Sequence, residues 1–352
     1  MSDAHHDTGP DWQPSWRDVW RSLAGGPGHR GPISDHFDGQ LFHNIEGGTG
    51  RSFWDLLRWR WTAQTQPWPQ WVENRARPAL PPALAHGEVA LTFVNHITFL
   101  IQFQGLNILT DPVYSERVSP FRSLGPKRVR APGLPFEQLP PIHLVLISHN
   151  HYDHLDLATL VRLASTHQPL FVTGLGNRAL LEQFALSDVR ELDWWESIDV
   201  RGVDVWFTPA QHWSGRGGRR TRNHTLWGGF TVRANGAQVF FAGDTGYSPH
   251  FKEIRQRLGR PDIALLPIGA YAPRWFMGPQ HMNPEDAVLA HRDLEAKVSI
   301  GTHFGCFQLT DEGIDDPVRE LTAARGRHRL RADDFQVLET GETRVYAAHS
   351  NV

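Results

Sequence analysis

The sequence predicts a layered α/β fold in which short buried strands alternate with amphipathic helices. Apolar runs of strand length lie at 89–94, 98–103, 107–110, 142–147, 203–208, 239–243 and 298–302. Stretches with the apolar spacing of a helix lie near 155–165, 177–184, 250–258 and 284–292. A chain of 352 residues with 40% hydrophobic residues can bury one large core plus an extension.

The first three strands are expected directly after Glu88, and a tight turn at Gln104-Gly105 joins the last two of them. Pro78 to Pro82 precede these strands and have the composition of a hinge. We therefore expect an N-terminal extension, residues 1–87, followed by the folded domain, residues 88–352.

The extension holds eight of the chain's 14 Trp: Trp12, Trp16, Trp20, Trp54, Trp59, Trp61, Trp68 and Trp71. Within it, Ser52 to Thr62 is predicted to form an amphipathic helix with Ser52 as its N-cap. Trp and Leu interleaved with Arg is typical of a membrane-surface helix. Large aromatic rings nevertheless pack in a core most often. We favour packing for most of these rings and keep an interfacial role as the alternative.

Residues 148–156 read Ser-His-Asn-His-Tyr-Asp-His-Leu-Asp and follow the strand expected at 142–147. Imidazole and carboxylate are the ligands that borderline divalent metals prefer. His149, His151, Asp153 and His154 are too close in sequence for all four to reach one ion comfortably, so two adjacent ions would share them more easily. A polar loop that is rich in His by chance is the weaker alternative, because the whole chain has only 20 His.

Three further candidate ligands also come just after strand-like runs. His212 follows 203–208, Asp244 follows 239–243 and His303 follows 298–302. Functional loops gather at strand ends in α/β architectures. Taken alone, His212 or His303 could equally be an ordinary half-buried histidine.

The His-x-His-x-Asp-His pattern at 149–154 resembles the signature of the metallo-β-lactamase superfamily, and the chain looks like its N-acylphosphatidylethanolamine-hydrolysing phospholipase D branch. The resemblance runs from about Val89 to about Phe307. It is carried by the segments 109–112, 125–128, 147–156, 211–213, 226–228, 241–247, 267–271, 273–277, 280–281 and 284–285. It implies a four-layer αββα sandwich, in which two sheets pack face to face with helices outside and the site lies at one edge.

The resemblance also implies a pair of divalent metal ions, with Zn²⁺ favoured and Mn²⁺ or Fe²⁺ as alternatives. It assigns His149, His151 and His212 to one ion, Asp153, His154 and His303 to the other, and Asp244 to both. A hydroxide held between two such ions is a nucleophile at neutral pH and needs no separate base. Attack of this hydroxide on phosphorus would expel one of the two alcohols of a phosphodiester. We expect Asp153, Asp244 and His281 to be the catalytic residues.

Residues for substrate binding are expected beyond the ligands. The resemblance places Gln280 and His281 at the active site, and Tyr271, Trp275, Phe276 and Met277 could wall an apolar channel or simply pack in the core. Two basic clusters could hold a phosphate or an anionic surface, although a solvated loop is the commoner role: Lys127, Arg128 and Arg130, and Arg216, Arg219, Arg220 and Arg222. His96 is expected to support structure rather than to bind metal.

Other classes of function find little support. A formal net charge of −3 gives no electrostatic case for nucleic acid. The chain shows no glycine-rich phosphate loop, dinucleotide fingerprint or nucleophile-elbow serine. The single cysteine, Cys306, excludes an internal disulfide and lacks the partners of a nucleophilic thiolate. Residues 1–6 lack the features of a secretory signal. We therefore expect a cytoplasmic protein, with peripheral contact at the inner face of the membrane left open.

The leading prediction is a dinuclear metal-dependent phosphodiesterase of phospholipase D type, acting on N-acylphosphatidylethanolamine-like phospholipids. One alternative is a hydrolase of a small soluble ester, such as a sugar-phosphate lactone. The other is a non-catalytic, metal-binding protein associated with membranes, which a complete ligand set disfavours. A homodimer is left open.

Overall fold

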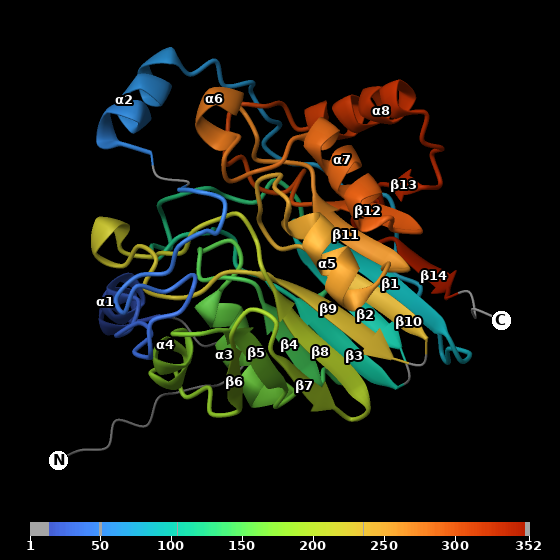
Figure 1. Ribbon diagram of the computed structural model, residues 1–352, viewed down its shortest axis with the longest axis horizontal. Coiled ribbons are helices and arrows are strands. Elements are labelled where there is room, and N and C mark those ends of the chain that lie inside the picture. Colours follow the sequence, from blue (N-terminus) through green and yellow to red (C-terminus); the bar gives the residue numbers. More distant parts are fainter. Residues whose placement is uncertain (1–13, 49–50, 104, 235, 349–352) are drawn as a thin grey trace.

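The apolar runs of the sequence pair into two mixed β-sheets that pack face to face, with helices on both outer faces (Figure 1). The structure is a computed structural model that describes residues 14–48, 51–103, 105–234 and 236–348. The four-layer αββα sandwich expected from the sequence is therefore confirmed. Residues 1–6, Trp12 and the turn residue Gln104 lie outside this description.

The first sheet has the strand order β14-β1-β2-β3-β4-β5-β6. Its strands β14 to β3 are antiparallel, whereas β3 to β6 run parallel. The strands are β1 (Glu88–Asn95), β2 (Thr98–Phe103), β3 (Leu106–Thr110), β4 (Leu144–Ile147), β5 (Leu170–Gly174), β6 (Val189–Leu192) and β14 (Thr343–Ala347). Two helices pack on its outer face: α3 (Leu157–Thr166) and α4 (Arg178–Glu182).

The second sheet has the order β13-β12-β11-β10-β9-β8-β7. Its strands are β7 (Ser197–Val200), β8 (Val203–Thr208), β9 (Gly229–Ala234), β10 (Ala237–Phe241), β11 (Ile263–Pro267), β12 (Val298–Thr302) and β13 (Phe335–Gln336). Three helices cover its outer face: α5 (His250–Leu258), α7 (Pro284–Leu294) and α8 (Asp316–His328). The shorter elements are α6 (Arg274–Met277) and the 3-10 turns Phe136–Gln138 and Gly218–Arg220.

Central strands read as continuous apolar runs because both of their faces are buried. In β4, Leu144 and Leu146 face the other sheet, whereas Val145 and Ile147 face the helices. In β10, Phe241 faces the other sheet and Phe240 faces the helices. This alternation follows from the two-residue period of a strand. It explains why the sequence located these strands well but could not assign their faces.

Two helices precede the first sheet, α1 (Trp16–Ala24) and α2 (Phe53–Thr62). Both begin with a capping box, and the predicted N-cap Ser52 of α2 is confirmed. The strands of both sheets lie between Glu88 and Ala347. The division of the chain at residue 87 stays a prediction. No helix in the described part of the chain combines the length and the apolar character that crossing a bilayer requires.

The tryptophans before β1 fall into two groups. Trp59 and Trp68 are half-buried and donate their indole N–H to Asp311 and to the Glu312 carbonyl, respectively. The rings of Trp16, Trp20, Trp54 and Trp61 are instead largely exposed. The expectation that most of these rings pack against the domain is therefore wrong for these four. Their helices are short and touch the domain along one side only, so the opposite side stays in solvent.

Candidate metal centre

The loops that leave four strands at one edge of the sandwich carry the predicted ligands. His149 follows β4, His212 follows β8, Asp244 follows β10 and His303 follows β12. His303 adopts a left-handed backbone conformation, with φ of 61°. Such conformations are costly for non-glycine residues and cluster at functional sites.

Gly243 lets the β10 loop approach the β4 loop closely. Its φ is 61°, and an added Cβ atom would lie 2.7 Å from Ser148 Cβ. Glycine therefore suits this position both because of its backbone conformation and because of the available space. The next residue, Asp244, is brought between the two loops.

The first cluster consists of three imidazoles. His149 Nε2 lies 2.7 Å from His151 Nδ1, and His212 Nε2 lies 3.3 Å from the same atom. His149 and His212 are buried, and His151 is half-buried. Three nitrogen atoms thus converge on one point.

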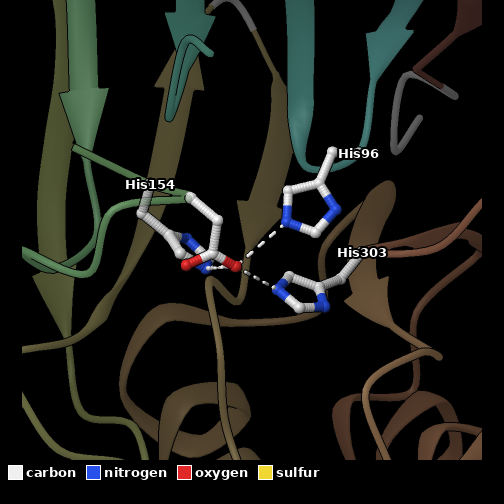
Figure 2. A group of neighbouring side chains, drawn as sticks. His96, His154 and His303 are labelled. Carbon is white, nitrogen blue, oxygen red and sulfur yellow. Dashed lines mark hydrogen bonds and ion pairs between the residues drawn. The ribbon is translucent and has the colours of Figure 1, made fainter. Parts of the chain in front are cut away.

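The second cluster surrounds the carboxylate of Asp153. Figure 2 labels the three imidazoles of this cluster, His96, His154 and His303. Asp153 Oδ2 lies 3.2 Å from His303 Nε2 and 3.4 Å from His154 Nε2. His96 also points its Nε2 at this oxygen, from a distance of 3.1 Å. The sequence assigned no site role to His96, which lies in the turn between β1 and β2.

Asp244 lies between the two clusters. Its Oδ2 is 3.2 Å from His154 Nε2 and 3.8 Å from His212 Nε2, while its Oδ1 is 3.2 Å from His303 Nε2. His281 Nδ1 lies 3.7 Å from Asp244 Oδ2. The structure therefore brings together all seven residues that the resemblance nominated, with His281 beside them.

Charge at the centre favours a bound cation. Burial tends to raise the pKa of Asp153 and of Asp244, but the surrounding imidazoles outweigh it and hold both pKa values well below the ordinary range. Burial tends to lower the pKa of His154, yet Asp244, Asp153 and Asp111 raise it well above its usual value. The carboxylates of Asp153 and Asp244 around the imidazole of His154 leave a negative charge that a divalent cation would neutralise.

The other imidazoles are prepared as neutral ligands. Burial lowers the pKa of His149 and of His212 well below the usual value, and it lowers the pKa of His151 to about 3. A metal ligand must carry a free lone pair, so a depressed imidazole pKa keeps these nitrogens ready at neutral pH.

Neighbouring groups orient the imidazoles of both clusters. Asp111 Oδ2 accepts a hydrogen bond from His154 Nδ1 at 2.7 Å. The carbonyl of Gln280 accepts one from His212 Nδ1 at 2.9 Å. Asn44, which precedes β1, exchanges two hydrogen bonds with the backbone of His212. Such partners select the tautomer and aim the other ring nitrogen at the centre.

The unpartnered atoms of the site fit a divalent ion. Among the described residues, His154 Nε2 and Asp244 Oδ1 are buried and have no hydrogen-bond partner. Ligand atoms about 2.0–2.2 Å from one tetrahedral ion stand roughly 3.3–3.6 Å apart. The carboxylate oxygens of Asp153 and Asp244 lie 3.2–3.4 Å from the Nε2 atoms of His154 and His303, which agrees with that spacing.

Residues of both clusters line a pocket of about 660 Å³. Its lining includes His151, Asp153, Asp244, His281 and His303 from the centre, the apolar side chains of Leu56, Trp59, Val118, Phe276, Met277 and Leu309, and the cationic side chains of Arg51, Arg216 and Arg222. Most of the pocket wall is therefore apolar, and the three arginines are cationic groups within it.

The structure brings four of the six predicted substrate-binding residues into this lining: Phe276, Met277, Gln280 and His281. Tyr271 and Trp275 lie outside it. Tyr271 is buried, and Trp275 is 37% exposed with the Arg58 guanidinium 4.8 Å from its ring centre. A short helix, α6, turns successive side chains in different directions, which a linear reading of residues 271–277 could not resolve.

The basic clusters divide into structural and pocket-facing residues. Arg128 and Arg216 are buried and donate to backbone carbonyls, Arg128 to Val113 and Arg216 to Asn150. Lys127 forms an exposed ion pair with Glu116. Of the remaining cluster members, Arg222 faces the pocket with its guanidinium 4.4 Å from the Trp213 ring centre, whereas Arg130 is half-buried and Arg220 is exposed. The side chain of Arg219 lies outside the description.

Comparison with known proteins shows which family this chain resembles. Residues 106–304 match the model of the β-lactamase superfamily domain. The chain is 36% identical over 274 residues to a Caenorhabditis elegans protein named N-acyl-phosphatidylethanolamine-hydrolyzing phospholipase D 1, a match that covers 73% of this chain and 76% of the relative. It is 30% identical to a metal-dependent hydrolase from Methanopyrus kandleri, over 72% of this chain and 98% of the relative.

Solved structures share the fold. An isothiocyanate hydrolase from Delia radicum gut bacteria aligns with a TM-score of 0.60 and 22% identity, over 74% of this chain and all of the other. At this identity the likeness extends to the arrangement of sheets and helices only.

Proposed function

Because this chain belongs to the metallo-β-lactamase superfamily, and to its N-acylphosphatidylethanolamine-hydrolysing phospholipase D-like branch, we propose that it is a dinuclear metal-dependent phosphodiesterase of phospholipase D type. One observation carries the proposal: two candidate ligand clusters meet at Asp244, which lies in the wall of a largely apolar pocket. The relatives support the coarser conclusion, a metal-dependent hydrolase. The lipid diester is our own further step.

In this proposal His149, His151 and His212 hold one ion, Asp153, His154 and His303 hold the other, and Asp244 contacts both. Zn²⁺ suits these ligands, and Mn²⁺ or Fe²⁺ would also be accepted. When bound, such a pair of ions would supply a hydroxide nucleophile at neutral pH and would stabilise charge on the phosphoryl oxygens. Water then adds across the bond between phosphorus and the leaving oxygen, which yields a phosphatidate and an N-acylethanolamine.

His281 is placed to assist this reaction. Burial lowers its pKa to about 4, although Asp244 opposes the shift, so the ring is neutral at pH 7. A neutral imidazole can donate one hydrogen bond and accept another. Its position 3.7 Å from Asp244 allows an N–H to reach a phosphoryl or leaving oxygen bound at the centre.

The pocket suits an amphiphilic diester. Arg51 and Arg222 lie in its wall and can attract a phosphate group, whereas Leu56, Trp59 and Phe276 offer apolar contact for acyl chains. A small lactone would leave most of this apolar wall unfilled. This wall therefore favours the lipid over the soluble ester.

Acyl-chain length should have a large effect on kcat/KM. Burial of each methylene contributes roughly 0.8 kcal/mol, so a few buried methylenes should raise kcat/KM by more than about tenfold. Turnover should be measured on a series of diesters of increasing acyl length, alongside a panel of lactones. Chelator treatment should abolish it, and returning Zn²⁺ should restore it. Better turnover of lactones, with no effect of acyl length, would replace the proposal with the soluble-ester alternative.

His96→Ala should weaken metal binding more than it weakens folding. A hydrogen bond to a ligating carboxylate typically contributes 10–100-fold to metal affinity or activity, so about that loss of affinity is expected for one of two ions. Titration of the metal-depleted protein with Zn²⁺ would measure it, and His86→Ala, an exposed histidine, is the matched control. An unchanged affinity for both ions would show that His96 only fills space.

We further propose that residues 1–87 form an extension to a hydrolase domain at 88–352. A cytoplasmic location, contact with the inner face of the membrane and a homodimer also remain predictions. Centrifugation of cell fractions and sedimentation velocity would test them.

A further inference from the structure

One face of helix α2 carries large apolar side chains that point into solvent. Trp54, Leu57 and Trp61 are spaced three and four residues apart and therefore lie along one side of the helix. Trp61 is 92% exposed and Leu57 is 41% exposed. Arg58 shares this side, and its guanidinium lies over the ring of the partly exposed Trp275. We call the four residues of this side, Trp54, Leu57, Arg58 and Trp61, the α2 outer face.

The opposite side of α2 belongs to the active-site pocket. Leu56 and Trp59 line that pocket. Trp59 also packs against Phe276, at 4.9 Å between ring centres, and donates its N–H to Asp311. Arg51, just before the helix, donates to the carbonyls of Trp275 and Phe276. Figure 1 shows α2 beside α6 at the periphery of the molecule. The helix thus forms part of the pocket wall with one side, and its outer face turns away from the pocket.

The charge of α2 is positive. Arg58 and Arg60 are exposed. The acid of the helix, Asp55, accepts hydrogen bonds from the backbone N–H and the hydroxyl of Ser52 as part of the capping box. Trp side chains prefer the interface between headgroups and acyl chains, and arginines attract anionic headgroups. Apolar, aromatic and cationic side chains on one short helix fit a lipid surface better than they fit water.

We propose that the α2 outer face docks on the surface of an anionic phospholipid bilayer. The proposal rests on the function proposed above and names the surface from which its substrate is taken. Docking there places the pocket, whose wall includes Leu56 and Trp59, next to the headgroups. An acyl chain can then pass from the bilayer to the apolar wall with little exposure to water.

Vesicle cosedimentation tests this directly. The parent protein should bind phosphatidylcholine vesicles that contain phosphatidylglycerol, and it should bind pure phosphatidylcholine vesicles less. Leu57→Ser with Trp61→Ser should reduce partitioning by about tenfold or more, because two exposed apolar side chains are lost. Arg58→Gln should reduce binding to the anionic vesicles roughly fivefold, and added salt should narrow that difference.

The matched control lies in α1, where Trp16 and Trp20 are 74% and 69% exposed on another helix with a capping box. Trp16→Ser with Trp20→Ser should leave vesicle binding unchanged. An equal loss in this control would show general adhesion of exposed tryptophans and would overturn docking through α2. Docking through α2 would also be overturned if the Leu57→Ser, Trp61→Ser variant bound vesicles like the parent. The same holds if the only effect of these substitutions were the conversion of a dimer to monomers, measured by sedimentation velocity.

Hydrolysis is measured separately so that the two proposals can fail independently. The Leu57→Ser, Trp61→Ser variant should lose turnover on vesicles and retain it on a short-chain diester dissolved as monomers. A parent protein that binds anionic vesicles but hydrolyses no diester would leave docking intact and remove the phosphodiesterase proposal. Hydrolysis of the soluble diester without vesicle binding would leave the phosphodiesterase proposal intact and remove docking.

Discussion

Replacement of Asp244 by Asn should lower hydrolysis by about 10²–10³-fold or more and should also reduce metal content. Asp244 contacts His303 through one carboxylate oxygen and both His154 and His212 through the other. An amide keeps the shape but loses the negative charge and one of the two acceptor oxygens. It therefore cannot join the two clusters. Because the other six proposed ligands remain, metal content should fall less than turnover.

The measurement pairs elemental analysis of the purified variant with kcat/KM on a diester. Asp204→Asn is the matched control, because Asp204 is an exposed residue of β8 and belongs to neither candidate ligand cluster. Its metal content and turnover should equal those of the parent. Full metal content together with full turnover in Asp244→Asn would contradict a mechanism that depends on two joined ions.

His281→Ala should lose about 10²–10⁴-fold in turnover while its metal content and melting temperature stay close to those of the parent. The reason is positional. His281 Nδ1 lies near Asp244 and has no hydrogen-bond partner among the described residues, while seven other side chains are the proposed ligands. Removal of this ring therefore takes away a hydrogen-bonding group from the substrate side of the centre.

Metal content is the decisive measurement for His281, because His281 groups with His212 and Asp244 closely enough to hold an ion itself. Loss of one ion in the alanine variant would make His281 a ligand and would require a revised assignment of His212. A lower melting temperature with unchanged turnover per folded molecule would make it a structural residue. His86→Ala, at an exposed position, controls for the loss of an imidazole as such.

The metal centre could be anticipated to the extent that its ligands are adjacent in sequence or follow recognisable strands. Residues 149–154 carry four candidate ligands within six positions, and the apolar run of β4 before them is unambiguous. His96 could not be found in this way. It lies 57 residues before Asp153, and its turn between β1 and β2 has no local pattern that distinguishes a site residue from a structural one.

The sequence by itself determined the strand runs, the helix that begins after Ser52 and the four candidate ligands within residues 149–154, because each depends on periodicity, capping or side-chain chemistry within a short window. The remaining proposed ligands were assigned through the family resemblance. Only the tertiary structure decided which side of α2 faces the pocket. It also decided the burial of Arg128 and Arg216 and the position of Asp244 between the two clusters. These outcomes depend on contacts between segments far apart in the chain. Local residue patterns carry little information about such contacts, because packing of the whole chain selects them.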